Sequence, residues 1–288
     1  TAGRLRLCGG EMDRLETLDD AWLLADDGRI AAFGRMETLG EMAADRTVER
    51  RKGAMLFPSF CDSHTHLVYA GSREQEFLDK INGLSYEEIS PPRRRNSQFG
   101  RPAARNLGRG ALRAGDGARA RDRREGNGLR RDQERLWSTT EDELKMLRVI
   151  RRIRETAPLA VRATFLGAHA VPRSYIGRQE EYVELVCNEM LPAVAAGKLA
   201  DFVDVFCDEG FFTVEQTARI MKAGRKLGMQ PKIHANELAV SGGVQVGVEY
   251  DALSVDHLER MGEAEIRALR GAVTSPTMLP GAAFFLRH

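Results

Sequence analysis

Cysteine is scarce in this sequence, and long apolar runs and glycine-rich phosphate-binding motifs are missing from it. The four cysteines among 288 residues are widely spaced and form no C-x-x-C pair, which excludes a dense disulfide framework and fits a reducing, cytoplasmic setting. No apolar run reaches the roughly 18 residues of a membrane span, and no signal peptide opens the chain. Neither G-x-G-x-x-G nor a P-loop occurs.

A strong excess of charge of either sign is also missing. Lysine and arginine number 43 against 42 aspartates and glutamates, so the net charge is +1. This balance gives the chain no general attraction to nucleic acids or membranes. The length is sufficient for one large domain, or for one large domain with a small one attached.

Residues 91–135 differ sharply from the rest in composition. They include fourteen arginines and seven glycines but no lysine, valine, isoleucine, tyrosine, methionine, cysteine or histidine. Such a composition is typical of a disordered basic linker, and it would also suit an arm that binds RNA or phosphate. Phe99 is the only aromatic residue there, which weakens the second interpretation because such arms stack bases on aromatic rings.

A third interpretation is that about 91–137 is translated out of frame. GC-rich coding DNA read out of frame yields arginine, glycine, alanine and proline without lysine. Residues 130–138 can be written with codons that, read one nucleotide later, encode Val-Glu-Ile-Lys-Ser-Gly-Tyr-Gly-Leu. That product has the form of a buried strand followed by a glycine-rich turn. We favour this interpretation, with the frame restored near Ser138.

The first 53 residues are predicted to form a small β-module. Two apolar runs within 21–34 flank Asp26-Asp27-Gly28, and Asp-Gly supplies the positive φ angles of a tight hairpin turn. An apolar run from Ala54 to Phe60 then predicts a buried strand. We therefore expect a β-module over 1–53 and a larger domain over 54–288.

From residue 139 onward, predicted strands and helices alternate. Strands are expected at 161–168, 201–206, 230–233 and 252–255, with another opening at 272–274; helices are expected at 140–156, 180–196, 213–227 and 263–269, with a short one after Ser241. This alternation implies a parallel sheet, either doubly wound or closed as a (β/α)8 barrel. Polar, metal-capable side chains at the end of strand after strand favour the barrel, because barrel enzymes build their sites on that rim.

Five of the six histidines fall at predicted strand ends, namely His64, His66, His169, His234 and His257. Any one alone is more often structural, but five together indicate a metal site. His64 and His66 are two apart and can point the same way from a strand. Imidazole suits zinc, iron, nickel and copper, and a catalytic metal takes about three protein ligands and leaves a position for water. We predict His64, His66 and His234 as the ligands.

Two further strand-end residues have the chemistry of proton transfer. Glu237 follows His234 by three residues and can handle a proton beside the metal, although alone it would equally suit an exposed loop. His257 can polarise a carbonyl or shuttle a proton. The alternative for His257 is a structural hydrogen bond to Asp256 or Glu259.

Arg73 lies just past the histidine pair. An arginine fork there suits a substrate carboxylate, because its paired N–H groups match the two carboxylate oxygens. The alternative is a surface salt bridge with Glu74 or Glu76. The sequence therefore predicts a small-molecule substrate that carries a carboxylate.

Several stretches together resemble the imidazolonepropionase family of the amidohydrolase superfamily. They are residues 62–74, which read Asp-Ser-His-Thr-His-Leu-Val-Tyr-Ala-Gly-Ser-Arg-Glu, and 83–89, 164–172, 232–237, 254–259 and 277–286. The resemblance covers nearly all of 1–90 and 139–288. It implies a metal-dependent (β/α)8 barrel with one zinc or iron ion, commonly a homodimer. It also implies hydrolysis of the cyclic amide C–N bond of 4-imidazolone-5-propanoate to N-formimidoyl-L-glutamate in histidine degradation.

The resemblance also implies roles for individual residues. The family's metal ligands match His64, His66 and His234. Its substrate contacts match Arg73, Tyr86 and His169, with Arg73 on the propionate carboxylate. Its acidic residue near the substrate and the water matches Glu237, and its further active-site histidine matches His257.

Two departures from the family set limits on this expectation. The family carries Lys-Ser-Gly-Tyr-Gly-Leu on its second barrel strand, where this chain has Glu134-Arg-Leu-Trp-Ser138. The family also has a metal-binding aspartate on its eighth strand, and this chain, whose ends both look cut, stops before it. We therefore expect an incomplete barrel that lacks a strand, a substrate contact and a ligand, and that is inactive or nearly so.

Two other functions stay open on the sequence. One is another amidohydrolase, such as a cyclic amidase or an aminohydrolase deaminase, which substrate turnover would distinguish. The other is a nucleic-acid-binding protein that uses the arginine-rich arm. Salt-sensitive RNA binding that is lost when 91–135 is deleted would indicate it.

Overall fold

The computed structural model describes residues 16–39, 53, 55–68, 81–83, 127–133 and 139–286, with only the backbone described over 127–133 and at 173, 285 and 286. Two compact units divide the chain, Thr1–Pro58 and Ser59–His288. Within the described part of the chain, no helix combines the length and apolar character needed to cross a membrane.

The first unit contains the predicted hairpin. Strands β1 (Ala21–Asp26) and β2 (Arg29–Arg35) pair antiparallel, and the short 3-10 helix η2 (Met36–Thr38) follows. Asp27 and Gly28 connect the strands with φ angles of 47° and 70°. Positive φ at both turn residues gives the twist that lets the strands pair, so the Asp-Gly prediction is confirmed.

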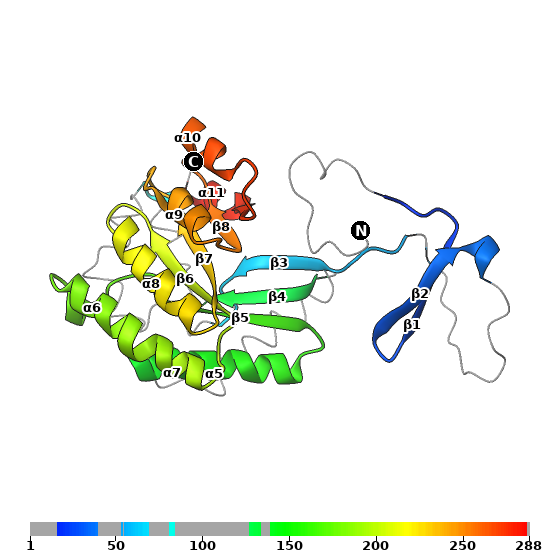
Figure 1. Ribbon diagram of the computed structural model, residues 1–288, viewed down its shortest axis with the longest axis horizontal. Helices are drawn as coiled ribbons and strands as arrows, with labels where there is room; N and C mark the ends of the chain where they lie inside the picture. Colours follow the sequence, from blue (N-terminus) through cyan, green and yellow to red (C-terminus); the bar gives the residue numbers. More distant parts are fainter. Residues whose placement is uncertain are drawn as a thin grey trace. The chain divides into compact units, whose positions relative to one another are not determined.

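The second unit is built on a parallel sheet of seven strands (Figure 1). They are β3 (Phe60–Thr65), β4 (Asn127–Gln133), β5 (Ala160–Ala168), β6 (Phe202–Cys207), β7 (Gln230–Ala235), β8 (Ser254–His257) and β9 (Ser275–Met278). Their order in the sheet is their order in the chain, without the reversal that defines a doubly wound sheet. Among the described residues β3 and β9 are the sheet edges, so the barrel-type sheet is not closed there.

The helices follow the strands and pack against the sheet. They are α5 (Thr140–Thr156), α6 (Gln179–Leu185), α7 (Leu191–Ala196), α8 (Val214–Lys226), α9 (Gly243–Glu249), α10 (Glu263–Leu269) and α11 (Pro280–Leu286), with the 3-10 turn η3 (Arg173–Tyr175) and the π-turn η4 (Val186–Met190). Helix α5 contacts β5, α8 contacts β6 and β7, and α9 contacts β7 and β8 (Figure 1).

Helix α8 shows how local sequence sets these boundaries. The Thr213 hydroxyl accepts the N–H of Gln216, whose side chain accepts the N–H of Thr213, so a capping box starts the helix. Gly228, with φ at 85°, follows its end. Ile220 and Met221 are fully buried against the sheet. The predicted helix over 213–227 is thus confirmed within a residue at each end.

Two predictions about strands are wrong. The strand predicted from Ala54 to Phe60 instead runs from Phe60 to Thr65, and Met55 and Leu56 are 79% and 74% exposed. A short apolar run does not determine where pairing starts, because register with the neighbouring strand decides it. The second barrel strand is also present, since the backbone of Asn127–Gln133 pairs in parallel with β3 and β5. Main-chain pairing uses N–H and C=O groups that every non-proline residue carries.

Candidate metal centre and active site

Alternation along the strands separates an apolar face from a polar one. In β7, Ile233 lies beneath Gly247 of α9, so its neighbours Lys232 and His234 point to the opposite, inner face. In β6, Val203 lies beneath Gly224 of α8, and Asp204 therefore points inward as well. The inner face consequently collects buried polar side chains that the helices do not cover.

Three histidines from different strands meet on this face. His64, His234 and His257 each offer a ring nitrogen within 4.8 Å of the other two. Their ring centroids are 4.5 Å apart for His64 and His234, and 5.1 Å apart for each pair that includes His257. Only 5%, 1% and 7% of these side chains is exposed, in chain order. Three convergent imidazoles of this kind could hold a metal ion.

His66 and His169 border this cluster. The His66 ring centroid lies 5.5 Å from that of His64 and 6.1 Å from that of His234. The His169 ring centroid lies 5.3 Å from that of His234 and 5.1 Å from that of Phe206. The compact triad thus contains His257 where the sequence predicted His66, and the role of His66 as a ligand stays a prediction.

Buried carboxylates orient two of the triad histidines. Nδ1 of His64 lies 2.9 Å from Oδ2 of Asp256, and Nδ1 of His234 lies 2.9 Å from Oδ1 of Asp204. A carboxylate at Nδ1 fixes the proton there and leaves Nε2 free as a ligand. Nε2 of His234 is buried and has no hydrogen-bond partner within the described ranges. A metal ion would satisfy that atom, so these residues fit one.

The electrostatics keep both of these histidines neutral. Burial lowers the pKa of His64 to about 3, with the nearby charge of His234 acting in the same direction. Burial likewise holds the pKa of His234 well below its usual value. Burial raises the pKa of Asp204 to about 7, whereas in Asp256 the charge of Lys232 outweighs burial and lowers the pKa. Neutral imidazole is the form that binds metals.

His257 has a different environment, between two acidic side chains. Its Nε2 lies 3.5 Å from Oε2 of Glu237, and its Nδ1 lies 3.5 Å from Oε2 of Glu259. Burial disfavours its charge, but the neighbouring carboxylates of Glu259 and Glu237 outweigh burial and raise its pKa. The sequence indicated Asp256 or Glu259 as a structural partner of His257. In the structure Glu259 lies beside His257, whereas Asp256 contacts His64.

Backbone conformation brings His257 to the inner face. Strict alternation along β8 would place Asp256 and His257 on opposite faces. His257 and Leu258 instead have φ angles of 89° and 66°, in the left-handed region that non-glycine residues rarely occupy. This turn at the strand end lets both neighbours serve one site.

Asp208 holds the loop that carries Glu237. Its carboxylate accepts four main-chain N–H groups, from Glu209, Glu237, Leu238 and Ala239, at 2.8 to 3.1 Å. Asp208 is one of the polar, metal-capable side chains that follow the predicted strands, and the sequence indicates no further role for it. The sequence did not identify Asp204 or Lys232 as site residues, although each is an isolated charge within an apolar strand, which is a usable signal.

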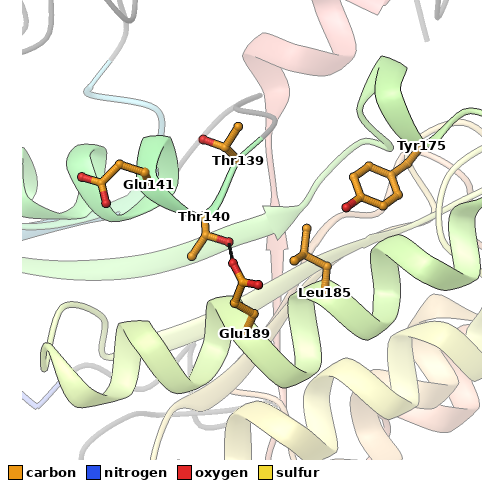
Figure 2. Close-up of a pocket in the computed structure, with 6 residues that line it drawn as sticks. All are labelled: Thr139, Thr140, Glu141, Tyr175, Leu185 and Glu189. Atoms are coloured by element: carbon orange, nitrogen blue, oxygen red, sulfur yellow. Dashed lines mark hydrogen bonds between the residues drawn. The ribbon is translucent and has the colours of Figure 1, made fainter.

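Arg73 and Tyr86 lie outside the described residues, so their predicted contacts with substrate remain predictions. A separate cavity of about 480 Å³ opens at the start of α5, where Thr140 donates a hydrogen bond to Glu189 (Figure 2). Thr139, Glu141, Tyr175 and Leu185 complete its lining. It shares no residue with the histidine cluster.

No family model matches this chain, but individual curated proteins are similar to it in sequence. It is 42% identical to imidazolonepropionases of Christiangramia forsetii and Flavobacterium johnsoniae, over 98% of this chain and 68% of each relative. It is 40% identical to the imidazolonepropionase of Burkholderia orbicola, over 99% of this chain and 70% of that protein.

Solved structures of low sequence identity share the fold. A guanine deaminase from C. acetobutylicum superposes with a TM-score of 0.59 at 12% identity, over 97% of this chain and 67% of that one. An adenosine deaminase from Xanthomonas campestris, solved with zinc, gives a TM-score of 0.53 at 16% identity, over 94% and 60%. These likenesses confirm the α/β metal-dependent hydrolase barrel fold. The identities of 40–42% over at least two thirds of each relative show that the chain belongs to the imidazolonepropionase family of the amidohydrolase superfamily.

Proposed function

We propose that this protein hydrolyses the cyclic amide C–N bond of 4-imidazolone-5-propanoate to N-formimidoyl-L-glutamate, with one zinc or iron ion bound. The observation that carries the proposal is the pair of carboxylate-backed histidines, His64 and His234, on the inner face of a barrel-type sheet. They occur in a chain 42% identical to imidazolonepropionases. The neutral imidazoles and the partnerless Nε2 of His234 support a resident metal ion.

His64, His66 and His234 would hold the ion. When bound, such an ion lowers the pKa of water towards neutrality and so supplies a nucleophile. Glu237 is buried within 3.5 Å of His257, in reach of the same space. Glu237 takes the proton of the attacking water and delivers it to the ring nitrogen that leaves. The hydroxyl adds to the ring carbonyl carbon, and the C–N bond breaks.

His257 acts on the carbonyl. Its raised pKa favours the protonated ring, which can donate a hydrogen bond to the carbonyl oxygen as negative charge develops there. Glu259 holds the opposite ring nitrogen at 3.5 Å and limits rotation. This division of labour leaves Glu237 to move protons and His257 to stabilise charge.

Substrate recognition is assigned to Arg73, Tyr86 and His169. Arg73 would bind the propionate carboxylate through its paired N–H groups. His169 borders the histidine cluster, 5.3 Å from His234 between ring centroids, which suits contact with a substrate ring. A cytoplasmic location and a homodimer are part of the same proposal.

The test is to load the purified protein with Zn²⁺ or Fe²⁺, remove unbound metal, and measure metal content and product formation. We expect about one ion per chain and metal-dependent turnover that His234→Ala and Glu237→Gln remove. Glu209→Gln is the matched control, because Glu209 is an exposed carboxylate in the loop after β6. Turnover of 4-imidazolone-5-propanoate no faster in the metal-loaded protein than in His234→Ala would overturn the proposal.

We expect the rate to be far below that of the family's full-length members. The family's tyrosine-bearing motif of the second strand is replaced in this chain at Glu134–Ser138, which removes a substrate contact. The side-by-side assay of a full-length relative supplies the comparison. Equal rates would contradict this expectation while leaving the assigned reaction intact.

A further inference from the structure

Lys232 is a fully buried lysine on the inner face of β7. A buried ammonium group is costly unless charge and hydrogen bonds compensate it. Its Nζ donates to Oδ2 of Asp256 at 2.6 Å and to the main-chain oxygen of Ser63 at 3.1 Å. These acceptors belong to β8 and β3, so one side chain connects three strands.

Both acceptors of Lys232 are in direct contact with His64. Ser63 immediately precedes His64 in β3, so its carbonyl belongs to the peptide group that carries the His64 nitrogen. Oδ2 of Asp256 is also the atom that lies 2.9 Å from Nδ1 of the His64 ring. Lys232 therefore fixes the main chain beside His64 and the carboxylate that orients its ring.

We infer that Lys232 is a positioning residue of the metal centre: through Ser63 and Asp256 it holds His64 with a proton on Nδ1 and with Nε2 directed to the ion. The inference rests on the metal site of the proposed function. It adds a residue that touches neither metal nor substrate, and it assigns that residue a measurable effect on metal affinity.

The arrangement on Asp256 explains why the lysine is needed. Lys232 and His64 both use Oδ2, while Oδ1 is buried with no hydrogen-bond partner within the described ranges. Within the described ranges, no hydrogen bond to Oδ1 therefore opposes rotation of the Asp256 carboxylate. Removing the lysine would thus leave Asp256 free to turn away from the His64 ring or to take up a proton. Either change removes the acceptor that keeps the His64 proton on Nδ1.

The position of Lys232 also links it to the second oriented histidine. Lys232 and His234 are two residues apart on β7 and share one face. Lys232 is the register partner of Asp204, the carboxylate that orients His234. A single strand thus supplies one ligand and the group that orients another, and its cation lies between the two orienting carboxylates.

The first measurement needs only the unaltered full chain without metal. ¹⁵N NMR of histidine-labelled protein reports which ring nitrogen is protonated, and the His64 signals are assigned by their loss in His64→Gln. We expect His64 with its proton on Nδ1. A proton on Nε2 instead would overturn the inference, whatever the stability of any variant.

The second measurement compares variants for Zn²⁺ affinity, by competition with a chromophoric chelator, and for thermal unfolding. Lys232→Met is expected to weaken Zn²⁺ binding about 10- to 100-fold, the range for partners of metal-ligating histidines, and to give His64 mixed protonation. Lys232→Gln retains a donor and should fall between Lys232→Met and wild type. If Lys232→Met does not fold, Lys232→Gln serves in its place, and the position of the His64 proton in the unaltered chain still decides.

Arg154→Met is the control for loss of an ion pair away from the metal centre, because Arg154 pairs with Asp201, the residue before β6, and both side chains are partly exposed. It should lower the unfolding temperature but leave Zn²⁺ affinity within twofold and the His64 proton on Nδ1. A folded Lys232 variant with unchanged affinity and unchanged His64 protonation would overturn the inference. Failure of the proposed function would look different: a wild-type protein that binds Zn²⁺ but does not hydrolyse the substrate.

Discussion

Oδ1 of Asp204 lies 2.9 Å from Nδ1 of His234 and accepts the main-chain N–H of the same residue at 3.2 Å. One carboxylate oxygen on β6 therefore fixes both the backbone and the ring of a residue on β7. The ring of His64 is likewise oriented by a carboxylate, that of Asp256 on β8, although β3 and β8 are not neighbours in the sheet. The ligand geometry depends on contacts between strands rather than on the histidines alone.

Asp204→Asn should weaken metal binding without unfolding the chain. An amide can still accept from His234 Nδ1, but it carries no charge and can present its NH₂ group instead. We expect Zn²⁺ affinity to fall about 10- to 100-fold, the usual effect of losing such a partner. Chelator competition measures this, with Asp251→Asn as the control, since Asp251 forms an exposed ion pair with Arg225. Unchanged affinity in Asp204→Asn would show that His234 needs no carboxylate.

Asp208→Asn should loosen the loop that carries Glu237. The amide retains one acceptor oxygen in place of the two that receive four N–H groups. Buried donors left without acceptors destabilise, and we expect a loss of about 2–3 kcal/mol in unfolding free energy. Hydrogen exchange should accelerate at the amides of residues 237–239. Glu209→Gln should change neither quantity, and slow exchange at those amides in Asp208→Asn would refute the assignment.

Local signals in the sequence predicted most of the second unit's helices and strands. Thr213, Gln216 and Gly228 mark the ends of α8 through groups within a few residues of one another, so no distant contact is needed to place them. The helix over 263–269 is found with the bounds predicted. The histidines at strand ends were likewise predictable, because the carboxyl ends of parallel strands share one edge.

The partners of those histidines could not be predicted in the same way. Asp204 contacts His234 through the register of β6 on β7, and Asp256 contacts His64 across the inner face, so both depend on long-range pairing. His257 reaches the site only because the chain adopts positive φ at that residue. A one-residue change of register would send each of these side chains to the other face.

Gly224→Ala should destabilise the packing of α8 on the sheet. An added Cβ would lie 2.5 Å from Cγ1 of Val203, which neither the helix nor the strand can readily avoid. Overpacking of this kind costs about 1–3 kcal/mol, although alanine's higher helix propensity offsets up to about 1 kcal/mol. Gly281→Ala in α11 is the matched control, because nothing lies within 4 Å of its added Cβ. Urea unfolding should show a loss for the first variant and none for the second.

Asp201 should make the stability of the fold depend on acid pH. Its carboxylate accepts the N–H of Ala163 at 2.8 Å and pairs with Arg162 and Arg154. Burial opposes ionisation, but the backbone hydrogen bond and the two arginines outweigh it and lower the pKa. A folded-state pKa below the unfolded value stabilises above about pH 4, the ordinary range for aspartate, and this contribution is lost as pH falls through the folded pKa.

Asp201→Asn should therefore destabilise the protein at pH 7 and matter less in acid. We expect a loss of about 1–2 kcal/mol at pH 7, kept modest because both arginines are partly exposed. The difference in unfolding free energy between wild type and variant, here called the gap, should shrink below about pH 4, because the wild-type carboxyl group then becomes neutral as well. Urea unfolding at a series of pH values measures this gap. A gap that stays constant from pH 7 into acid would mean that the charge of Asp201 contributes nothing and that only its shape matters.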